Sequence, residues 1–300
     1  AALAAVTLIP LLELFVHSGD YARRLDQEPG HTEARFLGAF FLFDYWGRPT
    51  QTPIPASILT NRGFYAGGIT LMLATAALVL RPTALRVAVA AFGAVALAVV
   101  VGADPFFSAI TALPGFRTAH NGRLIFLVLF ALALLAGWGL DELTSRERAP
   151  LGRRRLALAG ALVIFCVPFA WLLATGAIEL GRLGGALEVA WAFADPPTAA
   201  AGAAPDAATV AVIRLAALLE WLPLAAAGVG LVWLALFRRQ RLPVALVVGC
   251  AVGVLAVDLF RANMGFNPAI PIEHAEQPQT PALEYLESQL PNRFAVMSRS

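Results

Sequence analysis

The sequence predicts an all-α protein that crosses a membrane several times. Its composition is 59% hydrophobic and only 14% charged, with a mean hydropathy of +0.71, whereas an ordinary soluble domain has roughly 25% charged residues. Seven long apolar stretches run through the chain, and short arginine clusters separate several of them. They lack the period-2 alternation that is typical of a membrane barrel. Because backbone groups in hydrocarbon must pair within their own segment, we expect these stretches to be helices.

The candidate spans lie at or near the ~20 residues that a helix needs to cross a bilayer. They cover residues 1–16, 64–80, 84–102, 124–140, 155–175, 211–237 and 242–260. We therefore expect a transmembrane domain over residues 1–260. The run that begins at Ala1 has no basic region and no cleavage site, so it is not a signal peptide, and we expect the chain to be a fragment that lacks its natural beginning.

A truncated soluble domain is expected over residues 261–300. Thr280 and Pro281 together predict a capped helix start, because proline suits the first turn of a helix. Residues 293–297 have the pattern of a strand that the sequence cuts short.

The arginines predict the orientation of the spans. All 22 basic residues are arginine, and ten of them lie in three short connections, around Arg81, Arg148 and Arg238. By the positive-inside rule these connections are cytoplasmic. The segments left outside are residues 17–63, 103–123, 176–210 and the tail from Arg261. The net charge of +2 is then a topology signal, and no basic patch with interleaved aromatic residues indicates nucleic acid.

Four ionisable residues lie inside or beside the spans, each toward its outer end: Glu13, Arg214, Glu220 and Asp258. Charged side chains at this level are costly unless they face protein or a wet cavity, so together they predict a polar recess that opens outward. For Arg214 and Asp258 we favour the alternative that they extend to the lipid headgroups. For Glu220 both interpretations stay open.

The first outer loop carries a dense aromatic run over residues 33–47, which suits an interfacial helix in the headgroup plane. Asp44 and Arg48 flank its aromatic end. The favoured interpretation is a lipid-anchoring belt with solvated charges. The loop over residues 176–210 predicts a surface helix from Leu183, followed by a low-complexity connection.

The loop before the span at 124–140 carries Arg117, His120, Asn121 and Arg123. Arginine offers planar, bidentate donors to a phosphate at the headgroup level. A phosphate site is therefore as well supported as a simple lipid anchor.

Metal and redox chemistry find little support in the sequence. Cys166 and Cys250 each lie in the middle of a predicted span, and the four histidines are scattered without ligand spacing. We expect no metal site built by the protein alone and no evident cofactor. A requirement for a divalent metal stays open.

Several short motifs resemble those of the bacterial YfhO-type membrane proteins. The first is the run Leu113-Pro114-Gly115-Phe116 with Asn121-Gly122-Arg123, followed by the Gly-Leu end of the next span at Gly139 and Leu140. Others, in the same order along the chain, are Pro10 to Leu14 with His17-Ser18-Gly19, Tyr65-Ala66-Gly67-Gly68, Asp258-Leu259 with Phe266-Asn267-Pro268, and Thr280-Pro281.

This resemblance implies a glycosyltransferase of the GT-C type in the bacterial plasma membrane. Such an enzyme takes a sugar from a polyprenyl-phosphate donor in the lipid bilayer. It transfers the sugar on the outer face to a cell-envelope acceptor, here a glycan or a teichoic-acid-like polymer. The reaction needs a carboxylate to activate the acceptor and cations to stabilise the departing phosphate.

The resemblance also assigns roles to residues. In GT-C enzymes the catalytic carboxylate lies in the first outer loop, so we expect it upstream of Ala1 and expect this piece alone to be inactive. Asp44 and Glu220 are the remaining candidates within the chain. On the phosphate side Arg123 comes first and Arg117 second.

Two other functions stay open. A transporter or flippase of lipid-linked sugars would also need a polar recess, although repeated halves would be expected and no internal repeat is visible. A non-catalytic envelope assembly protein would account for the tail without any chemistry.

Overall fold

The computed structural model describes residues 10–11, 13–14, 17–47, 64–113, 115–176, 178–191, 206–238, 243–263 and 280–289. Over these residues the chain is helical, which confirms the prediction of an all-α membrane protein. Four helices are long and apolar enough to cross a bilayer, and two shorter apolar helices accompany them. Of the seven predicted spans, six contain one of these helices. The first, at residues 1–16, lies almost wholly outside the described residues.

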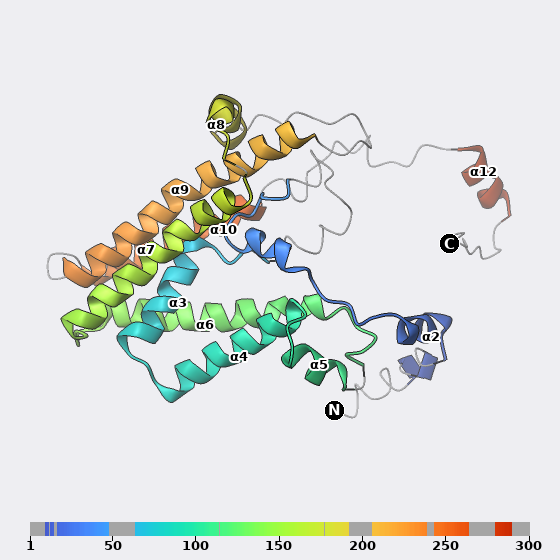
Figure 1. Ribbon diagram of the computed structural model, residues 1–300, viewed down its shortest axis with the longest axis horizontal. Helices are drawn as coiled ribbons and strands as arrows, with labels where there is room; N and C mark the ends of the chain where they lie inside the picture. The colour runs from blue at the N-terminus through green and yellow to red at the C-terminus, as the bar shows by residue number, and fades with distance from the viewer. Residues whose placement is uncertain are drawn as a thin grey trace. The chain divides into compact units, whose positions relative to one another are not determined.

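Six helices form the apolar bundle (Figure 1). They are α3 (Gly68–Leu80), α4 (Ala84–Val100), α6 (Ile125–Thr144), α7 (Leu151–Ala174), α9 (Ala207–Phe237) and α10 (Val244–Asn263). The connecting segments hold α2 (Gly19–Asp26), η1 (Ala34–Phe40), α5 (Phe106–Thr111), η4 (Asn121–Leu124), η5 (Leu180–Arg182) and α8 (Leu183–Trp191).

The chain divides into two compact units, Ala1–Phe266 and Asn267–Ser300. The second unit contains α12 (Pro281–Ser288). The Thr280 hydroxyl accepts a hydrogen bond from the Leu283 backbone N–H at 3.3 Å, so the predicted helix start is confirmed. The predicted strand at residues 293–297 lies outside the described residues.

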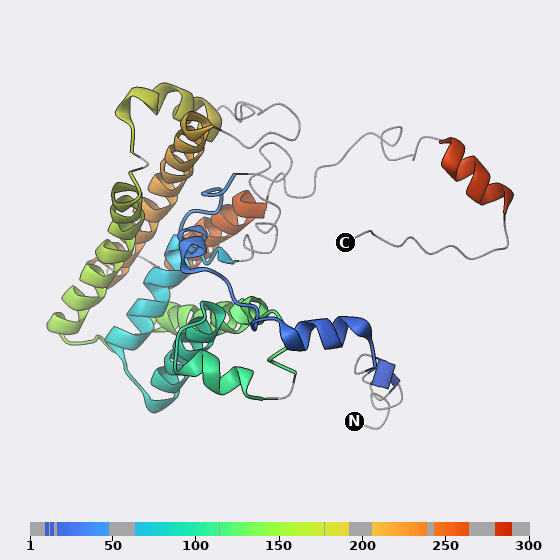
Figure 2. The ribbon, with the colours of Figure 1, turned by 45° about the vertical axis from the view of Figure 1, so that its right-hand side comes forward.

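Helix α3 is the centre of the bundle, and it contacts α6, α7, α9 and α10 (Figure 2). Its Met72, Ala76 and Ala77 are fully buried. With 13 residues it is about 20 Å long, whereas the hydrocarbon core of a bilayer is about 30 Å thick. The most central helix is therefore too short to span the membrane alone.

Helices α3 and α6 meet backbone to backbone at Gly139. A Cβ atom on Gly139 would lie 1.9 Å from the Leu73 carbonyl oxygen, so no other residue fits without parting the helices. Two residues away, a Cβ on Gly137 would meet nothing within 4 Å. Small residues allow such close approach of membrane helices, where dispersion contacts drive packing.

Arginines tie the helices together at one end of the bundle. The Arg86 guanidinium pairs with Glu142 at 2.7 Å, and it also donates to the Arg81 carbonyl at 2.8 Å. Arg153 donates to the Leu80 carbonyl at 3.3 Å, while the Arg154 guanidinium lies 4.7 Å from the centre of a ring on α9. We call this the Arg-rich end. Arginines of the predicted cytoplasmic connections therefore gather on the same side of the bundle.

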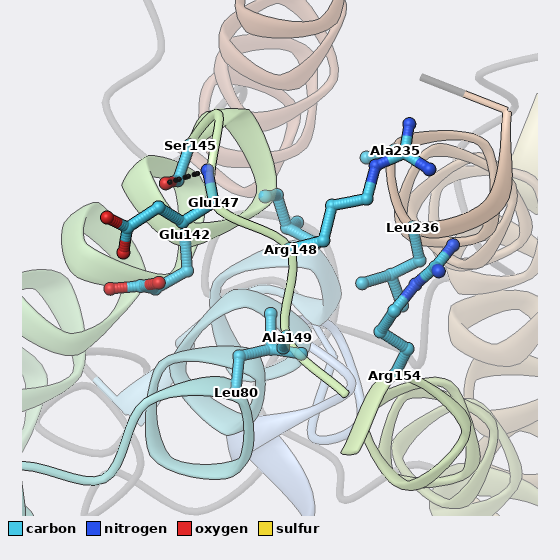
Figure 3. Close-up of a pocket in the computed structure, with 10 residues that line it drawn as sticks. Leu80, Glu142, Ser145, Glu147, Arg148, Ala149, Arg154, Ala235 and Leu236 are labelled. Carbon is cyan, nitrogen blue, oxygen red and sulfur yellow. Dashed lines mark hydrogen bonds between the residues drawn. The ribbon is translucent and has the colours of Figure 1, made fainter. Parts of the chain in front are cut away.

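A small cavity lies at the Arg-rich end (Figure 3). Its volume is about 30 Å³, which is room for about one or two water molecules. Arg148 and Arg154 extend to one side of it, next to Leu236, and Glu142 and Glu147 lie on the other side. This cavity is too small for a sugar or a phosphate, so we look for the functional site at the opposite end of the bundle.

Candidate functional site

The aromatic run of the first loop is buried within the protein at that opposite end. Phe36, Phe40 and Tyr45 are all less than a tenth exposed. The Phe43 ring packs edge-on against Tyr65 at 5.3 Å. Further ring contacts join this run to α9 and α7, from Phe41 to Trp221 and from Tyr45 to Trp171.

The prediction of a lipid-anchoring interfacial belt is therefore wrong. The segment forms the short 3-10 helix η1 and a series of turns whose rings face the helices. Asp44 is only 6% exposed, so its charge is not solvated. The physical reason is that the short α3 leaves an apolar recess between its neighbours, and burial in this recess competes with the headgroup region for the same side chains.

A cluster of ionisable side chains lies beneath this aromatic segment. It consists of Asp44, Tyr65, Glu220, Asp258 and Arg261, and we call it the polar cluster. The Tyr65 hydroxyl donates a hydrogen bond to the Asp258 carboxylate, and it lies within electrostatic reach of Glu220 and Asp44. The three carboxylates thus come from three parts of the chain that are far apart in sequence.

Asp258 does not extend to the headgroups as predicted. It is 2% exposed and is held by Tyr65 from the segment before α3. Gly67 makes this contact possible, because a Cβ at its position would lie 2.8 Å from the Asp258 carboxylate, and its φ of +81° also favours glycine. Asp258 therefore binds Tyr65 inside the protein and does not reach the headgroup region.

Glu220 faces the protein interior and does not extend to the headgroups, while the predicted recess that opens outward stays a prediction. It is 2% exposed and pairs with Arg261 of α10 at 3.0 Å. Arg261 also donates to the Ala190 carbonyl of α8 at 2.5 Å. This one guanidinium therefore joins α8, α9 and α10, and it offsets the buried negative charge of Glu220.

Asp44 and Glu220 line the same small cavity between α8, α9 and the first loop. Its volume is about 20 Å³, and Gly47, Val189, Ile213, Ala216 and Ala217 form the rest of its wall. The two carboxylates that sequence reasoning named as remaining catalytic candidates are thus neighbours. A cavity of this volume has room for a water molecule but not for a sugar.

A much larger apolar groove begins beside the polar cluster. Its volume is about 420 Å³, and it is lined by Tyr65, Ala66, Thr70, Leu73, Leu129, Leu132, Ala133, Ala136, Gly137, Leu140, Leu255 and Leu259. These residues belong to α3, α6, α10 and the segment before α3. We call it the α6–α10 groove. Tyr65 belongs to both the groove wall and the polar cluster, so the two are continuous.

A second apolar groove lies between α3, α4, α6 and α7, with a volume of about 340 Å³. It shares Leu132 with the α6–α10 groove and includes Phe40 and Phe41 of the first loop. No charged residue lines it. It therefore offers room for a hydrocarbon chain but no chemistry.

The predicted phosphate contacts before α6 have a different environment. Arg117, His120 and Arg123 are exposed, and none of them lines a described cavity. Asn121 is 2% exposed and its amide donates to the Phe116 carbonyl at 3.0 Å, so this side chain organises the loop. All four residues stay predictions as phosphate contacts.

Glu13 does not join the recess either. Its side chain is exposed, in a short stretch of which only parts are described. Arg48, the predicted partner of Asp44 at the end of the aromatic run, lies outside the described residues.

Sequence reasoning missed Tyr65 and Arg261 as site residues. Arg261 follows Asp258 by one helical turn, so both were bound to share a face of α10. Tyr65 stands two residues before Gly67 and Gly68, a pair whose lack of side chains admits Asp258 and Trp221. These spacings were the available signals.

The donor set of the polar cluster argues for hydrogen bonding and ion pairing. Within the described ranges, no three His, Cys, Asp or Glu side chains lie close enough to hold a metal ion. One arginine, one tyrosine hydroxyl and three carboxylates can bind hydroxyl groups, such as those of a sugar, and can accept a proton from one of them.

Comparison of the chain with protein-family models, with curated proteins and with solved structures found no match. The resemblance to YfhO-type proteins and the activity that it implies therefore stay predictions. What the structure itself carries is a membrane protein with a buried polar cluster at the end of an apolar groove.

Proposed function

We propose that the chain is the membrane part of a glycosyltransferase-like protein that binds a polyprenyl-phosphate-linked sugar. The observation that carries the proposal is the continuity of the α6–α10 groove with the polar cluster through Tyr65. A polyprenyl chain suits an apolar groove that opens among membrane helices, and the sugar suits a group of hydrogen-bonding side chains at its end.

The polar cluster supports acceptor activation as well as sugar binding. Asp44 is the better candidate for this role within the chain, because Glu220 is already neutralised by Arg261. A carboxylate upstream of Ala1, as expected from the sequence, stays a prediction. The proposed acceptor is a cell-envelope glycan or a teichoic-acid-like polymer.

Filling the α6–α10 groove is expected to block binding of the donor. Gly137→Leu places a side chain in open groove space without a steric clash. It displaces about three methylene groups of a bound chain, at about 0.8 kcal/mol each, so binding is expected to fall about tenfold or more. The measurement is photo-cross-linking to a polyprenyl phosphate that carries a diazirine in its chain.

Gly249→Leu is the matched control, because Gly249 is a glycine of α10 with open space around it that lines neither groove. We expect this variant to cross-link like the unmodified protein. Equal cross-linking of the Gly137→Leu and Gly249→Leu variants would show that the chain does not occupy this groove.

A transporter of lipid-linked sugars is the second candidate, because the buried Glu220–Arg261 pair joins two spanning helices, as ionisable pairs of transport pathways do. Reconstitution into vesicles separates the two functions. Movement of a fluorescent lipid-linked sugar between leaflets favours transport, and transfer of the sugar to an acceptor favours the transferase.

We place the Arg-rich end in the cytoplasm of a bacterial cell and the polar cluster toward the outside, by the positive-inside rule. Single cysteines at Ser145 and Ala112, in a protein whose Cys166 and Cys250 are replaced by alanine, are expected to react from opposite sides. An impermeant thiol reagent applied to intact cells should label the second alone. Labelling of the Ser145 position from outside would invert the orientation.

A further inference from the structure

The Arg214 guanidinium lies beside two rings of the first loop whose planes are nearly perpendicular, at 84°. Its central carbon is 4.6 Å from the centre of the Tyr45 ring and 5.4 Å from that of Trp46. Arg214 is half-buried, so protein covers part of its side chain, and its predicted extension toward the headgroups stays a prediction. The two rings attract the cation from two directions, because the face of an aromatic ring is electronegative, and they hold the guanidinium in place.

The depth of Arg214 follows from the length of α9. With 31 residues this helix is about 46 Å long and exceeds the hydrocarbon core by about 16 Å. Its last residue, Phe237, packs against Arg154 at the Arg-rich end. A distance of about 30 Å along the helix from Phe237 reaches Ala217, and Arg214 lies about one turn beyond it. Arg214 therefore lies at the headgroup level of the opposite leaflet.

The donors of Arg214 are available in the plane of the guanidinium. Its Nε is buried and has no hydrogen-bond acceptor, and Arg214 forms no ion pair with the described residues. A planar guanidinium can lie parallel to only one of two perpendicular rings, and N–H groups that the rings do not cover can bind an oxyanion. A buried donor without an acceptor is costly, so the geometry calls for a ligand that supplies one.

We propose that Arg214, held by Tyr45 and Trp46, binds the phosphate group of a lipid ligand at the headgroup level. The inference rests on the proposed function only for the identity of that lipid as a polyprenyl-phosphate-linked sugar. Glu220, two turns further along α9, does not oppose an anion here, because its charge is offset by Arg261. By contrast, Arg123 is exposed and stacks on no ring among the described residues.

The test uses the whole chain in nanodiscs of phosphatidylcholine, with farnesyl phosphate and farnesol as matched probes. Arg214→Gln is expected to weaken binding of farnesyl phosphate about tenfold or more, because a charge-assisted bidentate contact is lost. Farnesol has no phosphate, so its binding is expected to stay unchanged. Arg214→Lys keeps the charge and loses the fork, and we expect an intermediate loss.

Arg182→Gln is the control variant, because Arg182 forms an exposed pair with Glu179 and lies outside the proposed binding site. It is expected to bind farnesyl phosphate like the unmodified protein. Farnesyl phosphate binding that survives in Arg214→Gln overturns the inference. An equal loss of farnesol binding in Arg214→Gln would show a packing defect and would also overturn the inference. A loss of farnesyl phosphate binding in Arg123→Gln, with normal binding in Arg214→Gln, would overturn it as well.

Phosphatidic acid separates the inference from the proposed function. One outcome is that the unmodified protein prefers phosphatidic acid to farnesyl phosphate and that Arg214→Gln loses binding of both. This outcome would support the phosphate site and contradict a polyprenyl donor. A Gly137→Leu variant that binds farnesol normally, with the Arg214→Gln loss still present, likewise overturns the groove and keeps the site. Inorganic phosphate tests the site without any chain, and its binding is expected to be lost in Arg214→Gln.

Discussion

Replacing Arg261 with alanine is expected to destabilise the membrane unit by about 3–5 kcal/mol. The change leaves the Glu220 carboxylate, which is 2% exposed, without the cation that lies 3.0 Å from it. Breaking one side of a buried ion pair carries this cost because the remaining charge is not solvated. It also removes the hydrogen bond that joins α10 to the Ala190 carbonyl. The measurement is reversible unfolding in mixed detergent micelles.

Two variants check the cause of that loss. Arg182→Ala breaks a pair with Glu179 whose side chains are 36% and 49% exposed, so it is expected to change stability by less than about 1 kcal/mol. Adding Glu220→Gln to Arg261→Ala removes the uncompensated charge and is expected to restore part of the stability. An Arg261→Ala variant as stable as Arg182→Ala would mean that Glu220 finds another cation.

Arg86→Ala is expected to cost a similar amount at the Arg-rich end. The pair with Glu142 is 2.7 Å long and its two side chains are 10% and 12% exposed. The same guanidinium also donates to the carbonyls of Ala77 and Arg81, so three acceptors lose their donor together. Removal of one partner of such a pair is expected to cost about 3–5 kcal/mol in the same unfolding measurement.

Arg81→Ala is its matched control, because Arg81 faces Glu147 at 3.9 Å and the two side chains are 59% and 87% exposed. We expect at most about 1 kcal/mol there. Equal losses in the two variants would mean that general positive charge, rather than the buried pair, stabilises this end of the bundle.

The helical bundle could be predicted from the sequence because hydropathy reports directly on the solvent. Long apolar runs such as 211–237 have one stable arrangement in lipid, a helix with its backbone bonds satisfied internally. Helix ends were less accurate. Helix α7 begins at Leu151, so Arg153, Arg154 and Arg155 lie on the helix, since arginine can leave its charge at the interface while its backbone is helical.

The burial of the first loop could not be predicted in the same way. Phe36 and Phe43 are equally apolar beside a headgroup or beside a helix, so composition alone does not choose between the two. Whether these rings are buried depends on the space beside the N-terminal end of α3, and several helices together determine that space. Asp44 follows the segment inward for the same reason.

The polar cluster was predicted in part. Three of the four carboxylates that sequence reasoning placed toward the outside, Asp44, Glu220 and Asp258, do come together, because each lies near the same end of its segment. Their partners could not be predicted, since Tyr65 and Arg261 reach them only through tertiary packing. Arg123 in the loop before α6 stays the predicted phosphate contact. The proposed site at Arg214 depends on Tyr45 and Trp46, which only tertiary packing brings beside it.

Because α3 is short, a space is left between its neighbours within one leaflet of the membrane. Beside α6, which is 20 residues long, α3 stops about 10 Å early, and turns of the first loop complete the depth. Their backbone stays satisfied there, for example by the hydrogen bond from Ala66 N–H to the Phe40 carbonyl at 3.2 Å. Hydrogen-bonding groups thus stand at a depth where neighbouring lipids present only methylenes. The lipid ligand proposed above would enter this space sideways from the bilayer, without its polar head first being lifted into water.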